Sequence, residues 1–526
     1  MLLMLTILVP AVAGTLISAC FHEDRARRRW YTALIVLTDL LGVLTIVQGG
    51  RITPLVFAPG AEMTFSMDAL GRYVMAAVLL LYTSSGVYAF KYMEKEERTQ
   101  VFFAFYFISF GALLSVTMAG NLVTLYFCFE MATLSTVPLV LHELTKEAVA
   151  AGLKYLFYSI GGALMGLFAV FIVCTNTNGS NDFVMSGFLD PALTADHREL
   201  LLAAVMVGIV GFGTKAGLYP MHGWLPAAHP IAPAPASALL SGIVAKAGVV
   251  AVIRLVYYSV GTDFLRGTWV QTVWMVLALL TIFMGSMMAF REKNMKKRLA
   301  YSTVSQISYI LLGLSFLSAD GLKGGLLHLM AHAASKGCLF LAAGVFIFQL
   351  GIRDVAGLKG IGKKMPVTMI CFTMASLSLV GIPPMGGFLS KWVIATASLE
   401  SGIKGFSVAA PVMLLISALL TAGYLLTVAV DAFFPVRTEI LSSGRNMQVK
   451  ASGIPKRETK RNEKAAAGND EPVQASVSGG DGAAPTQEAV ASAEPSPLMV
   501  WPMVALSIAA LIMGIWGESV LGLFGL

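Results

Sequence analysis

Charged residues are scarce in this sequence: only 13% of its 526 residues are Asp, Glu, Lys or Arg, whereas 56% are hydrophobic. Soluble domains contain about a quarter charged residues, so the composition excludes an ordinary soluble protein. The formal net charge is +7, but the basic residues lie mostly at the ends of apolar stretches. We therefore expect a protein that contacts the lipid bilayer and has no nucleic-acid partner.

Paired cysteines and metal-ligating clusters are also missing. The five cysteines lie singly in apolar stretches without a CxxC pair, so we expect no disulfide framework, zinc site or iron–sulfur cluster. His328 and His332 are four residues apart, but no third metal ligand accompanies them. The glycine–lysine pattern at 357–363 lacks the Ser or Thr of a phosphate-binding loop. We expect no metal, no cofactor and no catalytic residue in the enzymatic sense.

Long apolar stretches are abundant, and about 20 such residues suffice to cross a bilayer. The pattern predicts an all-α polytopic membrane protein with about 14 transmembrane helices. The first stretch has no basic residues before it, so we expect a retained helix and not a cleaved signal peptide. The expected helices lie at 2–20, 31–49, 70–92, 101–119, 121–141, 149–174, 200–220, 235–258, 269–290, 298–318, 324–350, 366–395, 406–434 and 498–524.

The loops between these stretches alternate in their content of Lys and Arg. Clusters such as Arg25–Arg29 and Arg291–Arg298 follow odd-numbered stretches, and the loops after even-numbered stretches contain few basic residues. Because basic loops stay in the cytoplasm, we expect a multi-pass protein of a prokaryotic-type cytoplasmic (inner) membrane, with both termini on the extracytoplasmic side. An error in the helix count would disturb this alternation.

Two of the expected helices, the seventh and the twelfth, are broken by Gly and Pro at 217–220 and 381–387. Lipid cannot satisfy the backbone groups that such breaks free, so the breaks should face protein or a wet cavity. They are five helices apart, and an odd offset inverts the topology, which predicts two inverted five-helix repeats. The expected organisation is 1–100 with helices 1–3, a first bundle at 101–258, a second bundle at 269–434, a disordered cytoplasmic linker at 437–497, and a last helix within 498–526.

Ionisable residues inside apolar stretches are the candidate functional residues, because a charge at membrane depth costs at least about 2.5 kcal/mol. The stretch at 324–350 carries three of them, His328, His332 and Lys336, at positions i, i+4 and i+8, so they lie on one face of the expected helix. His222, beside the first break, is a supporting polar residue. The candidate proton relay consists of Glu130, Lys215, Lys246, His328, His332, Lys336 and Lys391.

Each of these residues by itself also has a structural explanation. Glu130 or Lys391 can extend its charge to the headgroups from near a helix end. The relay histidines can link helices, and His222 can cap freed backbone groups. The other histidines, His142, His197 and His229, are expected in loops or at interfaces. The set as a whole favours proton transfer, because burial disfavours a charged amine, a nearby carboxylate favours it, and histidine exchanges protons near neutral pH.

Around these residues the chain resembles the antiporter-like subunits shared by respiratory complex I, Mrp cation/proton antiporters and energy-converting membrane-bound hydrogenases. The resemblance covers roughly residues 60 to 435 and is most specific from Lys215 to Leu240. Supporting stretches lie at 298–303, 332–336 and 381–391.

The resemblance implies two inverted five-helix bundles, each with a half-channel. Glu130 and Lys215 would form the charge pair of the entrance half, Lys246 and the His/Lys face would continue the relay, and Lys391 would be its terminal site. It also implies that the chain binds no redox cofactor itself and works with other membrane subunits.

We therefore expect translocation of protons, or of protons and sodium ions, by one subunit of a multisubunit complex. Two alternatives stay open. The chain is a self-sufficient cation/proton antiporter if it is active when purified alone, and it is a scaffold if transport persists without its lysines. The sequence does not separate a complex I-like, a hydrogenase or an Mrp-type complex.

Overall fold

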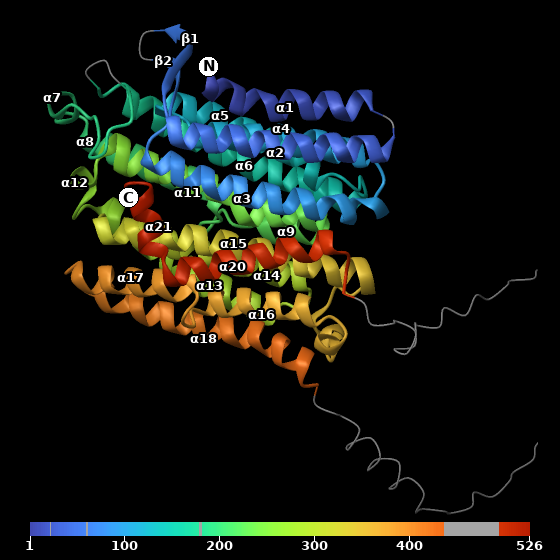
Figure 1. Ribbon diagram of the computed structural model, residues 1–526. Coiled ribbons are helices and arrows are strands. Elements are labelled where there is room, and N and C mark those ends of the chain that lie inside the picture. The colour runs from blue at the N-terminus through green and yellow to red at the C-terminus, as the bar shows by residue number, and fades with distance from the viewer. Residues whose placement is uncertain (22, 59–60, 178–180, 436–493) are drawn as a thin grey trace, which may run out of the picture.

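The computed structural model describes residues 1–21, 23–58, 61–177, 181–435 and 494–526. Long helices lie side by side along one common direction, and a small two-stranded sheet projects from one end of the bundle (Figure 1). In these described residues, 12 helices are long and apolar enough to cross a membrane. The predicted all-helical polytopic fold is confirmed.

The first half of the chain, up to residue 260, forms the following helical elements. They are α1 (Leu2–Cys20), α2 (Asp24–Gln48), α3 (Ala69–Tyr92), α4 (Thr99–Thr117), α5 (Leu122–Val140), α6 (Lys146–Cys174), the short α7 (Pro191–Thr194), α8 (Arg198–Ala216), α9 (Leu225–Ile231), α10 (Ala234–Leu239) and α11 (Ala245–Ile253), with π-helical turns η2 (Leu240–Val244) and η3 (Arg254–Val260) and a 3-10 turn η1 (Met93–Lys95).

The second half begins with the short α12 (Thr262–Leu265) and returns through the bundle several times. Its elements are α13 (Trp269–Arg291), α14 (Met295–Ser315), α15 (Ala319–Leu350), the 3-10 turns η4 (Val355–Leu358) and η5 (Ile361–Lys363), α16 (Pro366–Val380), α17 (Gly386–Glu400), α18 (Phe406–Phe433), α20 (Pro497–Ile515) and α21 (Gly517–Leu523).

The expected count of fourteen spans stays a prediction. The difference from twelve lies in α14, which is 21 residues long but carries many polar residues, and in α16 and α17, which are 15 residues each because a break divides them. The antiparallel strands β1 (Arg51–Ala58) and β2 (Ala61–Ser66), between α2 and α3, were not expected from the sequence. Each strand is too short to cross a membrane. The two strands pair with each other and project from one end of the helix bundle (Figure 1).

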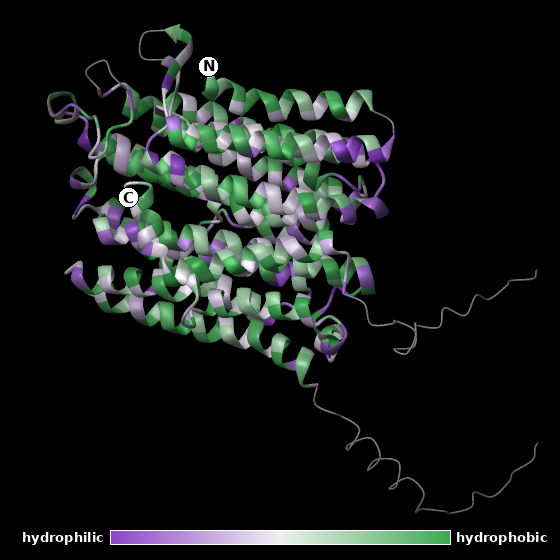
Figure 2. Ribbon diagram, viewed as in Figure 1, coloured by the Kyte–Doolittle hydropathy of each residue, from purple (hydrophilic) through white to green (hydrophobic). Residues whose placement is uncertain are grey.

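The segment Ala234–Val260 lies at the centre of the molecule, because all of its residues are buried. Outer helices instead present large apolar side chains to the surroundings, for example Phe157 on α6 and Leu419 on α18, which are 78% and 74% exposed. Hydrophobic residues run along the helices and hydrophilic residues gather towards their ends (Figure 2). This distribution suits a lipid solvent, since apolar side chains gain nothing from leaving it.

Both termini lie at the same end of the bundle, whereas α18 ends and α20 begins at the opposite end (Figure 1). The last long helix, α20, packs with one face against α3, α15, α16 and α17 and leaves side chains such as Trp501 exposed on the other. It thereby joins the N-terminal helices to the second half of the chain. The predicted linker at 437–497 falls almost entirely outside the described residues.

An ion pair between a buried arginine and a partly exposed aspartate joins the start of α3 to the end of the central segment. The Arg254 guanidinium is 1% exposed and donates to both carboxylate oxygens of Asp68, at 2.5 and 2.7 Å. Asp68 Oδ1 also accepts the Gly71 N–H at 2.9 Å and so caps α3. Burial raises the pKa of the Asp68 carboxyl, but the hydrogen bonds and charge of Arg254 outweigh it, and the pKa is lower than usual.

Asp68→Asn should destabilise the protein, because asparagine still caps α3 but leaves the buried Arg254 without its counter-charge. We expect a loss of up to about 3 kcal/mol, since breaking one side of a buried pair strands the other charge. The control is Asp263→Asn, whose ion pair with Arg266 is exposed on both sides and should contribute less than about 1 kcal/mol. Thermal unfolding of the two purified variants in detergent measures both losses. Equal unfolding temperatures for Asp68→Asn and Asp263→Asn would contradict a stabilising role of the Asp68–Arg254 pair.

Candidate functional site

Lys215 lies in the last turn of α8, directly before the first break. Gly217 ends the helix in a left-handed conformation with φ of +82°, which favours glycine. The Lys215 side chain reaches α5, where Nζ donates to Thr133 Oγ1 at 2.6 Å and to the Phe129 carbonyl at 3.2 Å. The amine also lies 4.1 Å from the centre of the Phe129 ring. The amine is thus held by neutral groups of α5.

Glu130 follows Phe129 on α5, but it forms no ion pair with Lys215 in the described part of the chain. Its Oε1 is buried and has no hydrogen-bond partner among those residues. The two charges are nevertheless close enough to interact through space. The predicted charge pair is therefore brought to one place without direct contact, and direct pairing stays a prediction.

Lys246 lies in the central segment and is fully buried. Its Nζ donates to the Ser241 carbonyl at 2.5 Å, within the π-helical turn η2, where the regular hydrogen-bond ladder changes. Ser241 Oγ pairs with Thr303 Oγ1 of α14 at 2.7 Å. A Cβ on Gly248 would lie 3.1 Å from Lys215 Cβ, so α8 and α11 approach closely and their lysines are on neighbouring helices.

His328, His332 and Lys336 are all buried on α15. The two imidazole rings stack with their centres 5.9 Å apart. His328 Nδ1 hydrogen-bonds Ser390 Oγ of α17 at 2.9 Å, and Lys336 Nζ donates to the Leu299 carbonyl of α14 at 3.0 Å. His328 Nε2 and both His332 nitrogens have no partner among the described residues. These side chains of α15 therefore connect it to α14 through Lys336 and to α17 through His328.

Lys391, on α17, is partly buried beside the second break. Its Nζ donates to the carbonyls of Leu379 at 2.5 Å and Val380 at 2.9 Å. These carbonyls end α16, where a helix has unpaired acceptors and a partial negative charge. The amine also lies 5.0 Å from the centre of the Tyr309 ring on α14. The lysine thus caps the broken helix.

These groups form one row from α8 through α11 and α15 to α17. Lys246 is close enough to Lys336 for their charges to interact, and His332 interacts with the charges of both and of Lys391. No group of three His, Cys, Asp or Glu that could hold a metal occurs within the described ranges. What the row offers chemically is a series of amines and imidazoles able to exchange protons.

The family model described as NADH:quinone oxidoreductase/Mrp antiporter, transmembrane, matches residues 119–421. The chain belongs to this family. It is an antiporter-like membrane protein, and the match contains every residue of the row.

Related antiporter-like proteins occur in several kinds of complex. The chain is 34% identical to NADH-quinone oxidoreductase subunit N of Desulforudis audaxviator, over 71% of this chain and 73% of that protein. It is 33% identical to hydrogenase-4 component B of Escherichia coli, over 64% and 51%. It is 30% identical to a subunit of the Na(+)/H(+) antiporter of Alkalihalophilus pseudofirmus, over 72% and 49%, so the chain spans about half of these last two relatives.

Solved structures give the same fold. A chain of the Mrp complex from Dietzia sp. DQ12-45-1b superposes with a TM-score of 0.79 at 23% identity, covering 99% of this chain and 96% of that one. A chain of respiratory complex I from Thermus thermophilus superposes with a TM-score of 0.71 at 19% identity, covering 99% of both. The resemblance that the motifs indicated is confirmed at the level of family and fold.

This antiporter-like protein also contains a buried lysine that sequence reasoning missed. Lys296 was expected in a basic loop, but it lies in the first turn of α14 and is only 4% exposed. Its Nζ donates to the carbonyls of Ala232 at 2.5 Å and Pro230 at 3.3 Å, at the end of α9. Nothing in the run of basic residues distinguishes it from its partly exposed neighbour Lys297.

Two histidines near the first break differ in their surroundings. His229 was expected in a loop or at an interface; it lies in α9, is fully buried, and stacks on Phe340 with ring centres 4.7 Å apart. His222 lies in the turn between α8 and α9 and stacks on Tyr219 at 5.8 Å. His222 Nδ1 and both His229 nitrogens are buried without partners in the described chain.

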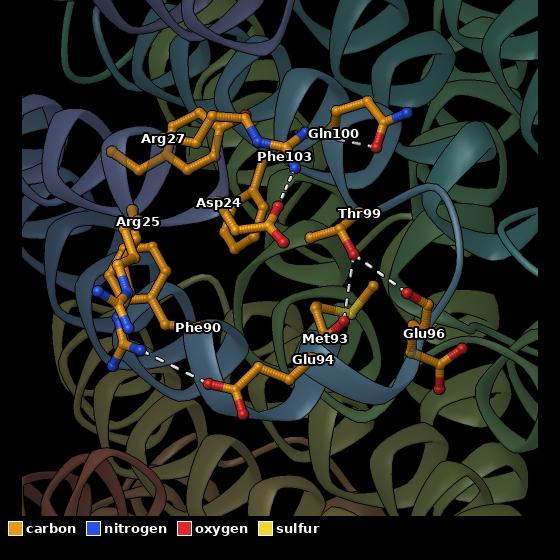
Figure 3. A pocket seen from close by; sticks show the side chains of 12 residues that line it. Asp24, Arg25, Arg27, Phe90, Met93, Glu94, Glu96, Thr99, Gln100 and Phe103 are labelled. Atoms are coloured by element: carbon orange, nitrogen blue, oxygen red, sulfur yellow. Dashed lines mark hydrogen bonds and ion pairs between the residues drawn. The ribbon is translucent and has the colours of Figure 1, made fainter. Parts of the chain in front are cut away.

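A pocket at one end of the bundle is separate from the row. It lies between the start of α2 and the turn that joins α3 to α4, where Arg27 faces Asp24 and the Thr99 hydroxyl donates to the Met93 and Glu96 carbonyls (Figure 3). No residue of the row lines it. The candidate functional groups therefore lie inside the helix bundle and are not gathered in this open pocket.

Lys296→Met should destabilise the protein, because it removes the amine that donates to the Pro230 and Ala232 carbonyls, and of these two only Ala232 keeps a side-chain donor, the Ser237 hydroxyl at 3.2 Å. Unsatisfied buried acceptors cost about 1–3 kcal/mol each. The matched control is Lys297→Met, which removes only a partly exposed ion pair with Glu292 and should cost less than about 1 kcal/mol. Thermal unfolding in detergent compares the two, and an equal or larger effect at Lys297 would refute the assignment.

Proposed function

We propose that this chain moves protons across the membrane through its row of buried basic groups, as one subunit of a multisubunit complex. One observation carries the proposal: the row contains four amines but, in the described part of the chain, not one ion pair. Their acceptors are neutral carbonyls and hydroxyls. The four amines are those of Lys215, Lys246, Lys336 and Lys391.

Because the acceptors are neutral, no counter-charge holds any of the four amines in its protonated form. In a low-dielectric interior an unpaired charge is costly and like charges repel strongly. A row of ammonium groups cannot all be charged at low cost, so a proton that arrives at one amine favours release from its neighbour. A salt-bridged lysine would keep its proton, and a fully apolar site would never take one.

The order of the groups suggests the direction of transfer. Lys215, with Glu130 nearby, would accept a proton, which then passes to Lys246 and to Lys336 on α15. The stacked histidines His332 and His328 would carry it towards α17. Lys391 would release it beside the second break. At each step an ammonium or imidazolium loses the proton that its neighbour gains, so the charge moves and no group is consumed.

We extend the proposal to two inverted bundles, 101–258 and 269–434, which would admit and release the proton. The two breaks lie between α8 and α9 and between α16 and α17. The packing supports the correspondence: α5 packs on α4 and α6, just as α14 packs on α13 and α15. Each break places a lysine of the row at a helix end.

Partner subunits would supply the energy, since the related proteins are named as parts of quinone oxidoreductase, hydrogenase and antiporter complexes. The chain itself would need no cofactor. Sodium ions are a second possible cargo, because carbonyl and hydroxyl oxygens also suit Na⁺. Transport measured with and without sodium in the same vesicles separates proton transport from exchange.

Lys215→Met and Glu130→Gln should each abolish proton transport, with at least about a tenfold loss, because the first proton acceptor loses its amine or its counter-charge. The assay is dye-reported proton uptake in energised membrane vesicles that contain the intact complex. Assembly is checked on a native gel. Lys323→Met is the control, as Lys323 pairs with Glu518 at the surface. Normal transport in both variants would leave only a scaffold role.

The proposed orientation places both termini outside the cytoplasm. In a background without the native cysteines, Asp190→Cys, between α6 and α8, should react with a membrane-impermeant maleimide in intact cells. Lys293→Cys, between α13 and α14, should react only after permeabilisation. The reverse labelling pattern would overturn the orientation and the positive-inside argument behind it.

A further inference from the structure

Gln306 on α14 is a fully buried amide that the proposed relay does not include. Its Nε2 donates to the Leu379 carbonyl at 3.4 Å, the same oxygen that accepts the Lys391 amine at 2.5 Å. Its Oε1 is buried without a partner among the described residues. Buried amides normally satisfy both ends, so this free acceptor next to the Lys391 site requires an explanation.

The side chains around Gln306 come from both sides of the last step of the relay. One turn further along α14, the Tyr309 ring lies under Lys391 and also meets His328 edge-on, with ring centres 5.3 Å apart. The His328 ring in turn lies against the backbone of Gln306. Gln306 and Tyr309 therefore occupy the space between the histidines of α15 and the lysine of α17.

Within this space the Tyr309 hydroxyl and His328 Nδ1 are already engaged. The Tyr309 hydroxyl donates to Ser417 Oγ of α18 at 2.5 Å, which directs it away from the step. His328 Nδ1 pairs with Ser390. His328 Nε2 makes no hydrogen bond of normal geometry in the described chain, where the Gln306 backbone is its polar neighbour, and no hydrogen bond joins His328 to Lys391 there. Gln306 Oε1 is the free acceptor that α14 offers at this point.

We propose that Gln306 Oε1 anchors an ordered water through which a proton passes from His328 to Lys391. The His328 Nε2–H bond breaks as a water O–H bond forms, and the same water gives up another proton to the neutral Lys391 amine. The positive charge moves from α15 to α17. The amide gains and loses no proton; Gln306 is a positioning residue. This inference rests on the proposed function.

A purely structural role for Gln306 is the competing explanation, and the chain offers a comparison. Gln271 on α13 is also buried, and both of its ends are satisfied: Nε2 donates to the Ser315 carbonyl at 3.0 Å and Oε1 accepts the Gly267 N–H at 2.9 Å. A glutamine that only fastens helices is thus fully paired here. Gln306 is paired at one end, and its open end lies beside the relay.

The first experiment compares Gln306→Met with Gln271→Met in the intact complex, by proton uptake in energised vesicles. Methionine keeps the length of the side chain and removes the acceptor. We expect Gln306→Met to assemble normally and to lose at least about fivefold in transport rate, because one proton-carrying hydrogen bond is broken. Gln271→Met should stay within about twofold of wild type. Equal rates in the two variants would overturn the inference.

The second experiment uses Gln306→Glu, which keeps the shape and the acceptor but adds an ionisable group. The titratable groups around this position are Lys391 of α17, His328 and His332 of α15, Tyr309 of α14 and Lys246 of α11. A carboxyl among them should shift the pH profile of transport, an effect that a fastening role would not produce. An unchanged profile overturns the inference, even if Gln306→Met fails to assemble.

Lys391→Met separates this inference from the proposed function. If transport persists in Lys391→Met, the relay itself is wrong. If Lys391→Met abolishes transport while both Gln306 variants behave like wild type, the relay stands and only the role of Gln306 is refuted.

Discussion

Every polar group inside a bilayer-spanning protein must find its hydrogen-bond partners within the protein, and this constraint shapes the whole site. A regular helix uses its own carbonyls, so a buried amine has few acceptors available. Irregular backbone provides them. Lys246 binds a carbonyl of a π-helical turn, Lys391 binds the end of α16, and Lys296 binds the end of α9. For these three lysines irregular backbone supplies the acceptors, whereas Lys215 and Lys336 donate to carbonyls within α5 and α14.

Close packing of the backbone keeps these acceptors in place. A Cβ on Gly387 would lie 1.7 Å from the Ser378 carbonyl, so only glycine lets the start of α17 pass the end of α16 at this distance. The same contact holds Ser390 and Lys391 against the break. At the other break, Gly217 ends α8 in a left-handed conformation two residues after Lys215. Both lysines are thus positioned by glycines that the broken helices need for steric reasons.

The surrounding helices separate the row from lipid. The central segment, which carries Lys246, is wholly covered by protein, and α20 closes over α15, which carries the histidines. Outer helices such as α6 and α18 bear the large exposed apolar side chains. Five groups of the row are therefore confined to the interior, whereas its two end groups, Glu130 and Lys391, are partly exposed.

The membrane class, the helical fold, the two breaks and the ionisable residues within apolar stretches could all be predicted from the sequence. These features are local: hydropathy follows from about 20 consecutive residues, and a charge within such a stretch is visible without knowing its neighbours. The family resemblance rested on equally local motifs. The β1–β2 hairpin and the exact number of spans were less accessible, because short strands and polar helices such as α14 give weak signals.

The contacts of each charged group depend instead on the tertiary structure. Lys215 on α8 binds Thr133 and Phe129 on α5, Lys296 is buried where a loop was expected, and Asp68 meets Arg254 across 186 residues. Gln306 gave no signal at all, since a single glutamine in a polar helix is inconspicuous until its neighbours are known. Hydrogen bonds between distant residues depend on how the helices pack, and hydropathy carries no information about that geometry.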